Sequence, residues 1–150
     1  MAKFVYRMQN ILNIKQKLET QAKMTYSLAK QKYLEQQKIL QEYMVRRVGY
    51  EQHWKKLMQG NLNLQEVEHA RADVNAMKTI VRRQMVEVHK AEKELEDARN
   101  RLKTVMQERK VQEKLREKAF EEFKQELAEA ETKEIDELVS YTYNKGEQGE

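Results

Sequence analysis

Apolar residues recur through the first sixty positions at alternating steps of four and three, the spacing of a helix face that packs against another helix. The line opens with Ile11, Lys15 and Leu18. It continues through Ala22, Tyr26, Ala29, Tyr33, Gln36, Leu40, Tyr43, Arg47, Tyr50, Trp54 and Leu57. This pattern predicts one long helix over about residues 3–58.

The pattern breaks at the stretch "MQGNLNLQEVEH". Gly60 suits the left-handed conformation that ends many helices. Asn63 followed by Glu66 matches a capping box, and Leu62 and Val67 occupy the two positions of a hydrophobic staple. These signals predict a turn at 59–62 and a second helix that starts at about 63.

The second helix carries a similar line in two blocks. The first block holds Val81, Met85, Val88, Leu95, Leu102 and Met106. The second block holds Phe120, Phe123, Leu127 and Ala130. Charged residues fall on the line between and within them, namely Glu92, Arg99, Arg109, Glu113 and Arg116, unless the register slips to Val105, Leu115 and Ala119. We therefore predict a helix over about 63–143, a tail over 144–150 and a discontinuous core.

A short turn makes two helices antiparallel neighbours. The predicted fold is all-α: a single two-helix antiparallel coiled-coil hairpin, over residues 1–150, with a long C-terminal helix overhang. If Leu57 faces Leu64, residue i faces about residue 121 − i, so Phe4 should meet about residue 117. Residues after about 118 should then lack a partner helix.

Composition supports this fold and excludes several classes of protein. Charged residues make up 36% of the chain, and proline and cysteine are absent. Without cysteine there are no disulfides and no thiolate metal sites. No apolar run is long enough for a membrane span. These features favour a soluble cytosolic protein with no cofactor and no metal.

Charge is distributed unevenly along the chain. Residues 1–60 hold 12 basic and 4 acidic side chains (+8), residues 61–118 hold 14 and 11 (+3), and residues 119–150 hold 3 and 10 (−7). This polarity indicates attraction between opposite ends or two different partners.

Sites for chemistry are not evident in the sequence. His53, His69 and His89 lack metal-ligand spacing, and four scattered glycines form no phosphate loop. A two-helix rod also offers no concave catalytic pocket, so we expect no enzymatic activity. The lysines of the first helix are dispersed around it, which argues against a basic nucleic-acid-binding region.

Apolar residues outside the predicted seam indicate a possible partner surface near the turn. On the first helix these are Ile39, Met44, Val45 and Val48, and on the second they are Met77, Ile80 and Val86. A thicker local core is the alternative explanation.

Several segments together resemble the FliJ family of the bacterial flagellar type III export apparatus. They are the opening "MAKFVYRMQNIL", the turn in mid-chain, and "EKLREKAFEEF" and "ETKEIDEL" near the end. The resemblance implies a non-enzymatic hairpin similar to the central stalk of rotary ATPases. It implies as partners the hexameric export ATPase FliI, the export gate FlhA and export chaperones, with a cytoplasmic location at the inner-membrane export apparatus.

The resemblance also implies where the partners bind. The ATPase-binding candidates are Phe4, Met8, Phe120, Phe123, Leu127, Lys133, Ile135, Asp136 and Leu138. The gate-binding candidates are Gln36, Leu40, Tyr43, Met77 and Ile80. The chain departs from the family pattern at Arg47 and Asp73, where relatives carry aromatic residues.

Three other functions remain open at this point. A similar stalk could serve a virulence secretion system, a parallel homodimer could act as a scaffold, and a basic rod could bind nucleic acid. The turn at Gly60–Asn63 favours a hairpin over a parallel dimer of unbroken helices.

Overall fold

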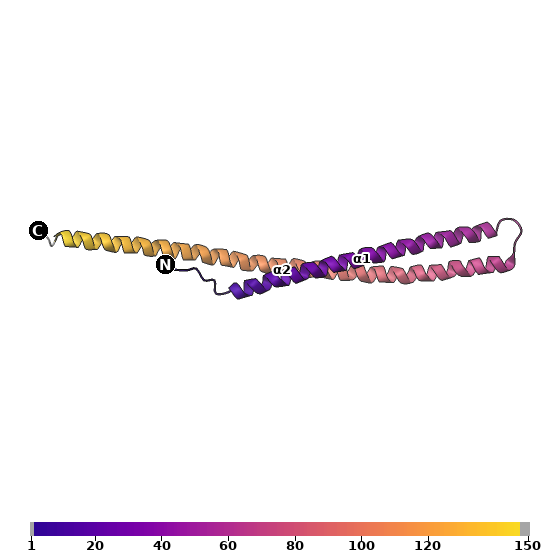
Figure 1. Cartoon of the computed structure of the whole chain (residues 1–150), viewed down its shortest axis with the longest axis horizontal. Helices are drawn as coiled ribbons and strands as arrows, with labels where there is room; N and C mark the ends of the chain where they lie inside the picture. Colours follow the sequence, from indigo (N-terminus) through magenta and orange to yellow (C-terminus); the bar gives the residue numbers. More distant parts are fainter. Residues whose placement is uncertain (1, 148–150) are drawn as a thin grey trace. The chain divides into compact units, whose positions relative to one another are not determined.

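The computed structural model describes residues 2–147, which form two helices joined by one turn (Figure 1). Helix α1 runs over Gln9–Leu57 and helix α2 over Leu64–Glu147. In the part described, the chain contains no strand, so the predicted all-α helical hairpin is confirmed. Helix α1 begins at Gln9, later than the predicted residue 3. Helix α2 continues past 143 to Glu147.

The fold divides into two compact units, and each is described by itself. The turn unit comprises residues 20–104. The terminal unit comprises residues 1–19 and 105–150, of which 2–19 and 105–147 are described.

The turn follows the sequence signals closely. Gly60 has a φ of 89°, a conformation that glycine adopts without steric cost. The side-chain oxygen of Asn63 accepts a hydrogen bond from the backbone N–H of Gln65 at 3.1 Å, which caps α2 as predicted. Leu62 is 56% exposed, although the sequence suggested that it would staple onto Val67.

The seam of the turn unit runs antiparallel, since Lys32 pairs with Glu94 while Gln36 bonds to Gln84. On α1 the predicted line holds from Ala22 to Leu57 with one change. Tyr50 is exposed and Glu51 takes its place on the line.

On α2 in this unit the predicted line is wrong at every second position, namely at Met85, Glu92 and Arg99, which are exposed. Gln84 is buried instead of Met85, and alanines lie in the core where Glu92 and Arg99 were expected. The buried residues of α2 in this unit are Ala70, Val74, Met77, Val81, Gln84, Ala91, Leu95 and Ala98. The core is therefore continuous here, because small alanines fill seam positions that a search for large apolar residues passes over.

In the terminal unit, Leu12 and Val105 form the buried apolar core. Val105 belongs to the alternative register considered above. Residues 2–8 are not helical, and Phe4 lies against Phe120 and Phe123. A non-helical chain advances up to about 3.3 Å per residue against 1.5 Å in a helix, so Phe4 reaches beyond residue 117.

The overhang is confirmed with a different starting point. Ala119 and Phe123 are half-buried, whereas every residue from Lys124 to Glu147 is exposed. We call residues 124–147 the overhang. The sequence placed its start after residue 118 because it assumed a helical path for residues 3–8.

Candidate functional site

Phe4, near the start of the chain, forms an aromatic cluster with Phe120 and Phe123 of α2 in the terminal unit. The Phe4 ring lies 5.0 Å from that of Phe120 and 5.5 Å from that of Phe123, measured between centroids. The Arg116 guanidinium lies 5.7 Å from the Phe4 ring, and the Lys124 ammonium lies 4.7 Å from the Phe120 ring. Cations over aromatic faces are attracted by the ring quadrupole. These contacts hold the non-helical residues 2–8 on α2.

The other residues predicted to bind the ATPase are exposed. Met8 is 41% exposed and Leu127 37%. Ile135 and Leu138 are 60% and 65% exposed, and Lys133 and Asp136 are also exposed on the overhang. The structure thus brings Phe4, Phe120 and Phe123 together and leaves the candidates from Leu127 onward on a helix that other described residues do not cover.

Sequence reasoning missed an ion-pair network in the same unit. Arg109 contacts the buried Glu19 through Nε and pairs with Glu113 at 2.8 Å. The hydrogen bond to Glu113 is the main cause that raises the pKa of Arg109 above its ordinary value, and Glu19 adds to it against the opposing effect of burial. Lys15 also pairs with Glu108 at 2.8 Å. Because a buried charge is costly without a partner, the pairing of Glu19 with Arg109 disfavours registers that separate them.

The residues predicted to bind the export gate lie in the turn unit, where they are mostly half-buried. The side-chain N–H of Gln84 donates to the side-chain oxygen of Gln36 at 2.7 Å and to its backbone oxygen at 3.0 Å. Leu40, Tyr43 and Ile80 are half-buried, and Arg46 lies 5.9 Å from the Tyr43 ring. Met77 is 7% exposed and belongs to the core.

The exposed apolar surface of this unit lies instead on the outer side of α1. Met44, Val45 and Val48 are 39%, 66% and 49% exposed, and together with Gln41 they line a shallow hollow of about 240 Å³. All three residues were among those that the sequence placed outside the seam. Ile39, from the same group, is half-buried, and Val86 on α2 is 54% exposed.

A second hollow, of about 400 Å³, is lined by residues of both helices including Trp54, Met58 and Val74. The indole Nε1 of Trp54 is buried and has no hydrogen-bond partner among the described residues. A buried donor of this kind raises the free energy of the fold unless water or a partner accepts its hydrogen bond.

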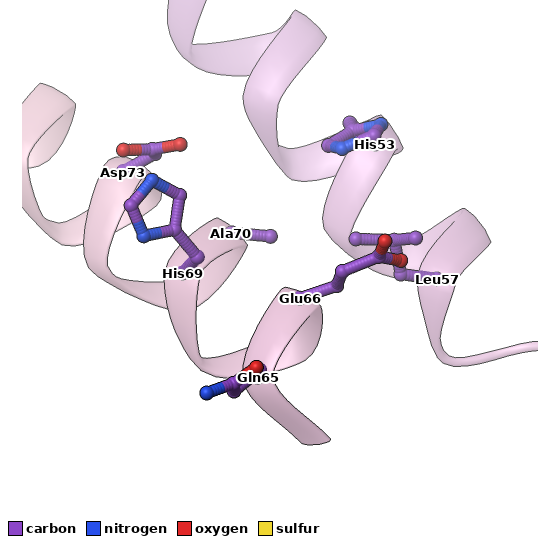
Figure 2. A pocket seen from close by; sticks show the side chains of 7 residues that line it. All are labelled: His53, Leu57, Gln65, Glu66, His69, Ala70 and Asp73. Carbon is purple, nitrogen blue, oxygen red and sulfur yellow. The ribbon is translucent and has the colours of Figure 1, made fainter. Parts of the chain in front are cut away.

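A larger open hollow, of about 550 Å³, lies beside the turn (Figure 2). Leu57 and Ala70 are its apolar lining residues. The polar lining residues are His53, Gln65, Glu66, His69 and Asp73. In Figure 2 the imidazole of His69 lies beside Asp73, while the Glu66 side chain extends toward Leu57. Across residues 2–147, His, Asp and Glu side chains form no group of three that could hold a metal ion.

A search of the described helices for a membrane-spanning segment finds none that is long and apolar enough.

Comparison with protein families gives one match over nearly the whole chain. The family described as "Flagellar FliJ protein" matches residues 4–148. No curated protein matches, and no solved structure matches.

Proposed function

The chain belongs to the flagellar FliJ family, and from this premise we propose that it acts as a non-catalytic shaft between the export ATPase and the export gate. The family places the chain among components of the flagellar export apparatus. The finer role comprises docking of the terminal unit in the ring of the ATPase FliI, contact of the turn unit with the gate FlhA, and assistance to export chaperones.

The exposed overhang is the observation that carries this proposal. Ile135 and Leu138 are each at least 60% exposed on a helix that no other described residue covers. Fully burying one such side chain contributes about 1.5–3 kcal/mol, so a surface that covers the overhang gains substantial free energy. Around these residues the overhang is acidic, which suits a basic collar in a ring-shaped partner.

The turn unit supplies the second half of the proposal. Tyr43 is half-buried and the next residue, Met44, is exposed at the edge of the seam, so an apolar partner surface can contact both. We expect the gate to bind here through Gln36, Leu40, Tyr43 and Ile80. Met77 lies in the interhelical core and would support this surface from below.

The test combines one double variant with a matched control. Ile135→Asp with Leu138→Asp should abolish co-purification of the ATPase from a native lysate and stimulation of ATP hydrolysis. Val111→Asp, at a site in the terminal unit that is 55% exposed, should leave both intact. Circular dichroism should show unchanged helix content in both proteins. Full stimulation by the double variant would rule out the overhang as the ATPase-binding element.

The same pull-down separates the flagellar function from a virulence secretion function, because the identity of the captured ATPase decides between them.

A further inference from the structure

Two unpartnered helix faces of this chain complement each other in length, charge and apolar content. The first is the overhang. The second is the outer face of α1 in the turn unit, which we define by its exposed apolar residues Met24, Leu28, Leu34, Met44, Val45 and Val48. All six lie off the seam that α1 shares with α2 and are 39–66% exposed.

The lengths of the two faces agree. The overhang has 24 residues (124–147) and the outer face spans 25 (24–48). At a rise of 1.5 Å per residue each covers about 36–38 Å. One helix could therefore lie along the other for its whole length.

The charges of the two segments are opposite in sign. The overhang holds seven acidic residues and three lysines, a balance of −4. Residues 24–48 hold five basic residues (Lys30, Lys32, Lys38, Arg46 and Arg47) and two acidic ones (Glu35 and Glu42), a balance of +3. Of these, Lys32 pairs with Glu94 and Arg47 with Glu51. Opposite potentials steer two surfaces together and fix their register.

Much of this charge is not neutralised within the chain. None of the acidic residues of the overhang forms an ion pair among residues 2–147, and neither Lys30 nor Lys38 does so. By heptad position Lys38 lies at the centre of the outer face, and Lys30 lies at its edge next to the seam. Both lysines are exposed, so an acidic helix that lies on this face would be attracted to them.

The overhang also presents an apolar stripe. Leu127, Ile135, Leu138 and Val139 follow at spacings of eight, three and one, which places them within about 120° around the helix axis. Their exposed fractions are 37%, 60%, 65% and 62%. Glu131 and Glu134 lie close to this stripe by the same spacing.

We propose that the overhang of one copy of this protein docks on the outer face of α1 of a second copy. Each copy brings both surfaces, so the free protein self-associates with a strength that depends on its concentration and on salt. The association covers Leu127, Ile135 and Leu138, and a partner that binds the overhang must first displace the second copy. This inference goes beyond the proposed function and does not depend on the ATPase.

Charge exchange provides the test. In one full-length variant, Lys30→Glu and Lys38→Glu make the outer face acidic. In another, Glu131→Lys and Glu134→Lys make the overhang basic. Either variant alone should associate at least about tenfold more weakly than the unchanged protein, because like charges then face each other. An equimolar mixture should associate again, since the acidic outer face of one variant meets the basic overhang of the other.

Sedimentation velocity without ATPase measures the result against the 18.1 kDa monomer. Arg82→Glu with Arg83→Glu is the matched control: it changes net charge by the same amount as the outer-face variant at two exposed positions of α2. It should associate like the unchanged protein. Raising salt from about 50 mM to about 500 mM should weaken association, because this shortens the screening length several-fold.

Three results would overturn the proposal. The first is a monomer at all concentrations up to about 100 µM, the range in which weak complexes form. The second is a mixture of the two variants that fails to associate. The third is loss of association in the control variant. Each leaves the proposed function untouched, because ATPase binding by the overhang does not require a second copy.

Discussion

Phe4 packs edge-on against Phe120, with ring centroids 5.0 Å apart and ring planes at 66°. The two residues are separated by 116 positions in the sequence (120 − 4), yet they close the terminal unit. Edge-to-face pairs of this kind contribute about 0.5–1.5 kcal/mol beyond the area they bury. The contact explains why residues 2–8 follow α2 although they are not helical.

Phe4→Ala should release the N-terminal segment without unfolding the hairpin. We expect a loss of about 1–2 kcal/mol in the free energy of unfolding, which combines the aromatic pair with partial loss of burial. Urea denaturation measures this loss, and limited proteolysis should show faster cleavage before Gln9. Val5→Ala is the control, because Val5 is 75% exposed and should change neither result.

The buried pair of Gln36 and Gln84 should set register more than stability. Gln84→Ala removes two hydrogen bonds from a residue that is 8% exposed. We expect it to cost about 1–3 kcal/mol, since each hydrogen bond contributes about 0.5–1.5 kcal/mol net, with a larger cost if Gln36 finds no water. Thermal denaturation followed by circular dichroism gives the measurement.

Replacing both glutamines with leucine gives the contrasting result. Gln36→Leu with Gln84→Leu should be at least as stable as the unchanged protein, because an apolar pair leaves no polar group unsatisfied. The double variant should also tolerate alternative pairings of the helices, detectable as additional species in disulfide-trapping experiments with introduced cysteines. A strongly destabilised double variant would contradict this view of the pair.

Helix positions and the turn could be predicted because they depend on local signals. The positive φ of Gly60 and the cap at Asn63 follow from the chemistry of those residues. The α1 seam was also predictable, since its large residues repeat at heptad spacing. The α2 seam was not, because Ala91 and Ala98 are buried by the close approach of α1 and carry little apolar signal of their own.

The candidate surfaces were predicted less well, for two physical reasons. Helix spacing could not reveal that residues 2–8 leave the helical path, so the partner of Phe120 and Phe123 was missed. Nor could spacing decide which of two adjacent residues faces the seam, and Met77 was assigned to a surface although its neighbours bury it. The charge at Glu19 and Arg109 was visible in the sequence, but their pairing depends on the register.

Met77 and Val45 should respond differently to the same change. Met77→Asp places a carboxylate in the core and should cost about 3 kcal/mol or more, since a buried charge loses its hydration. Val45→Asp lies at a site that is 66% exposed and should leave stability nearly unchanged. Urea denaturation separates the two variants.

If the proposed gate contact is right, Met44→Asp and Tyr43→Ala should weaken binding of the purified gate domain while helix content stays constant. Binding measured by calorimetric titration provides the answer. Gln65→Ala, on the opposite helix beside the turn, serves as the control. Gate binding unchanged in both variants would show that Tyr43 and its neighbours are purely structural.

The overhang and the aromatic cluster should be separable by truncation. Removal of every residue after Phe123 takes away the part of α2 that is exposed throughout. Melting of the remaining hairpin should therefore change little. Removal of every residue after Lys118 also deletes Phe120 and Phe123, and Phe4 then loses both ring contacts. The shorter protein should melt at a lower temperature, by an amount that corresponds to about 1–3 kcal/mol for the lost aromatic burial.

Both truncated proteins should fail to stimulate the ATPase, because both lack Ile135 and Leu138. Stability and ATPase stimulation should therefore differ in the protein that ends at Phe123. This protein should stay as stable as the full chain but lose stimulation. Differential scanning calorimetry and an ATP hydrolysis assay on the same samples make the comparison. If the protein that ends at Phe123 unfolds at a much lower temperature, the overhang stabilises the hairpin through contacts that its exposure does not reveal. If that protein still stimulates hydrolysis, the aromatic cluster rather than the overhang binds the ring.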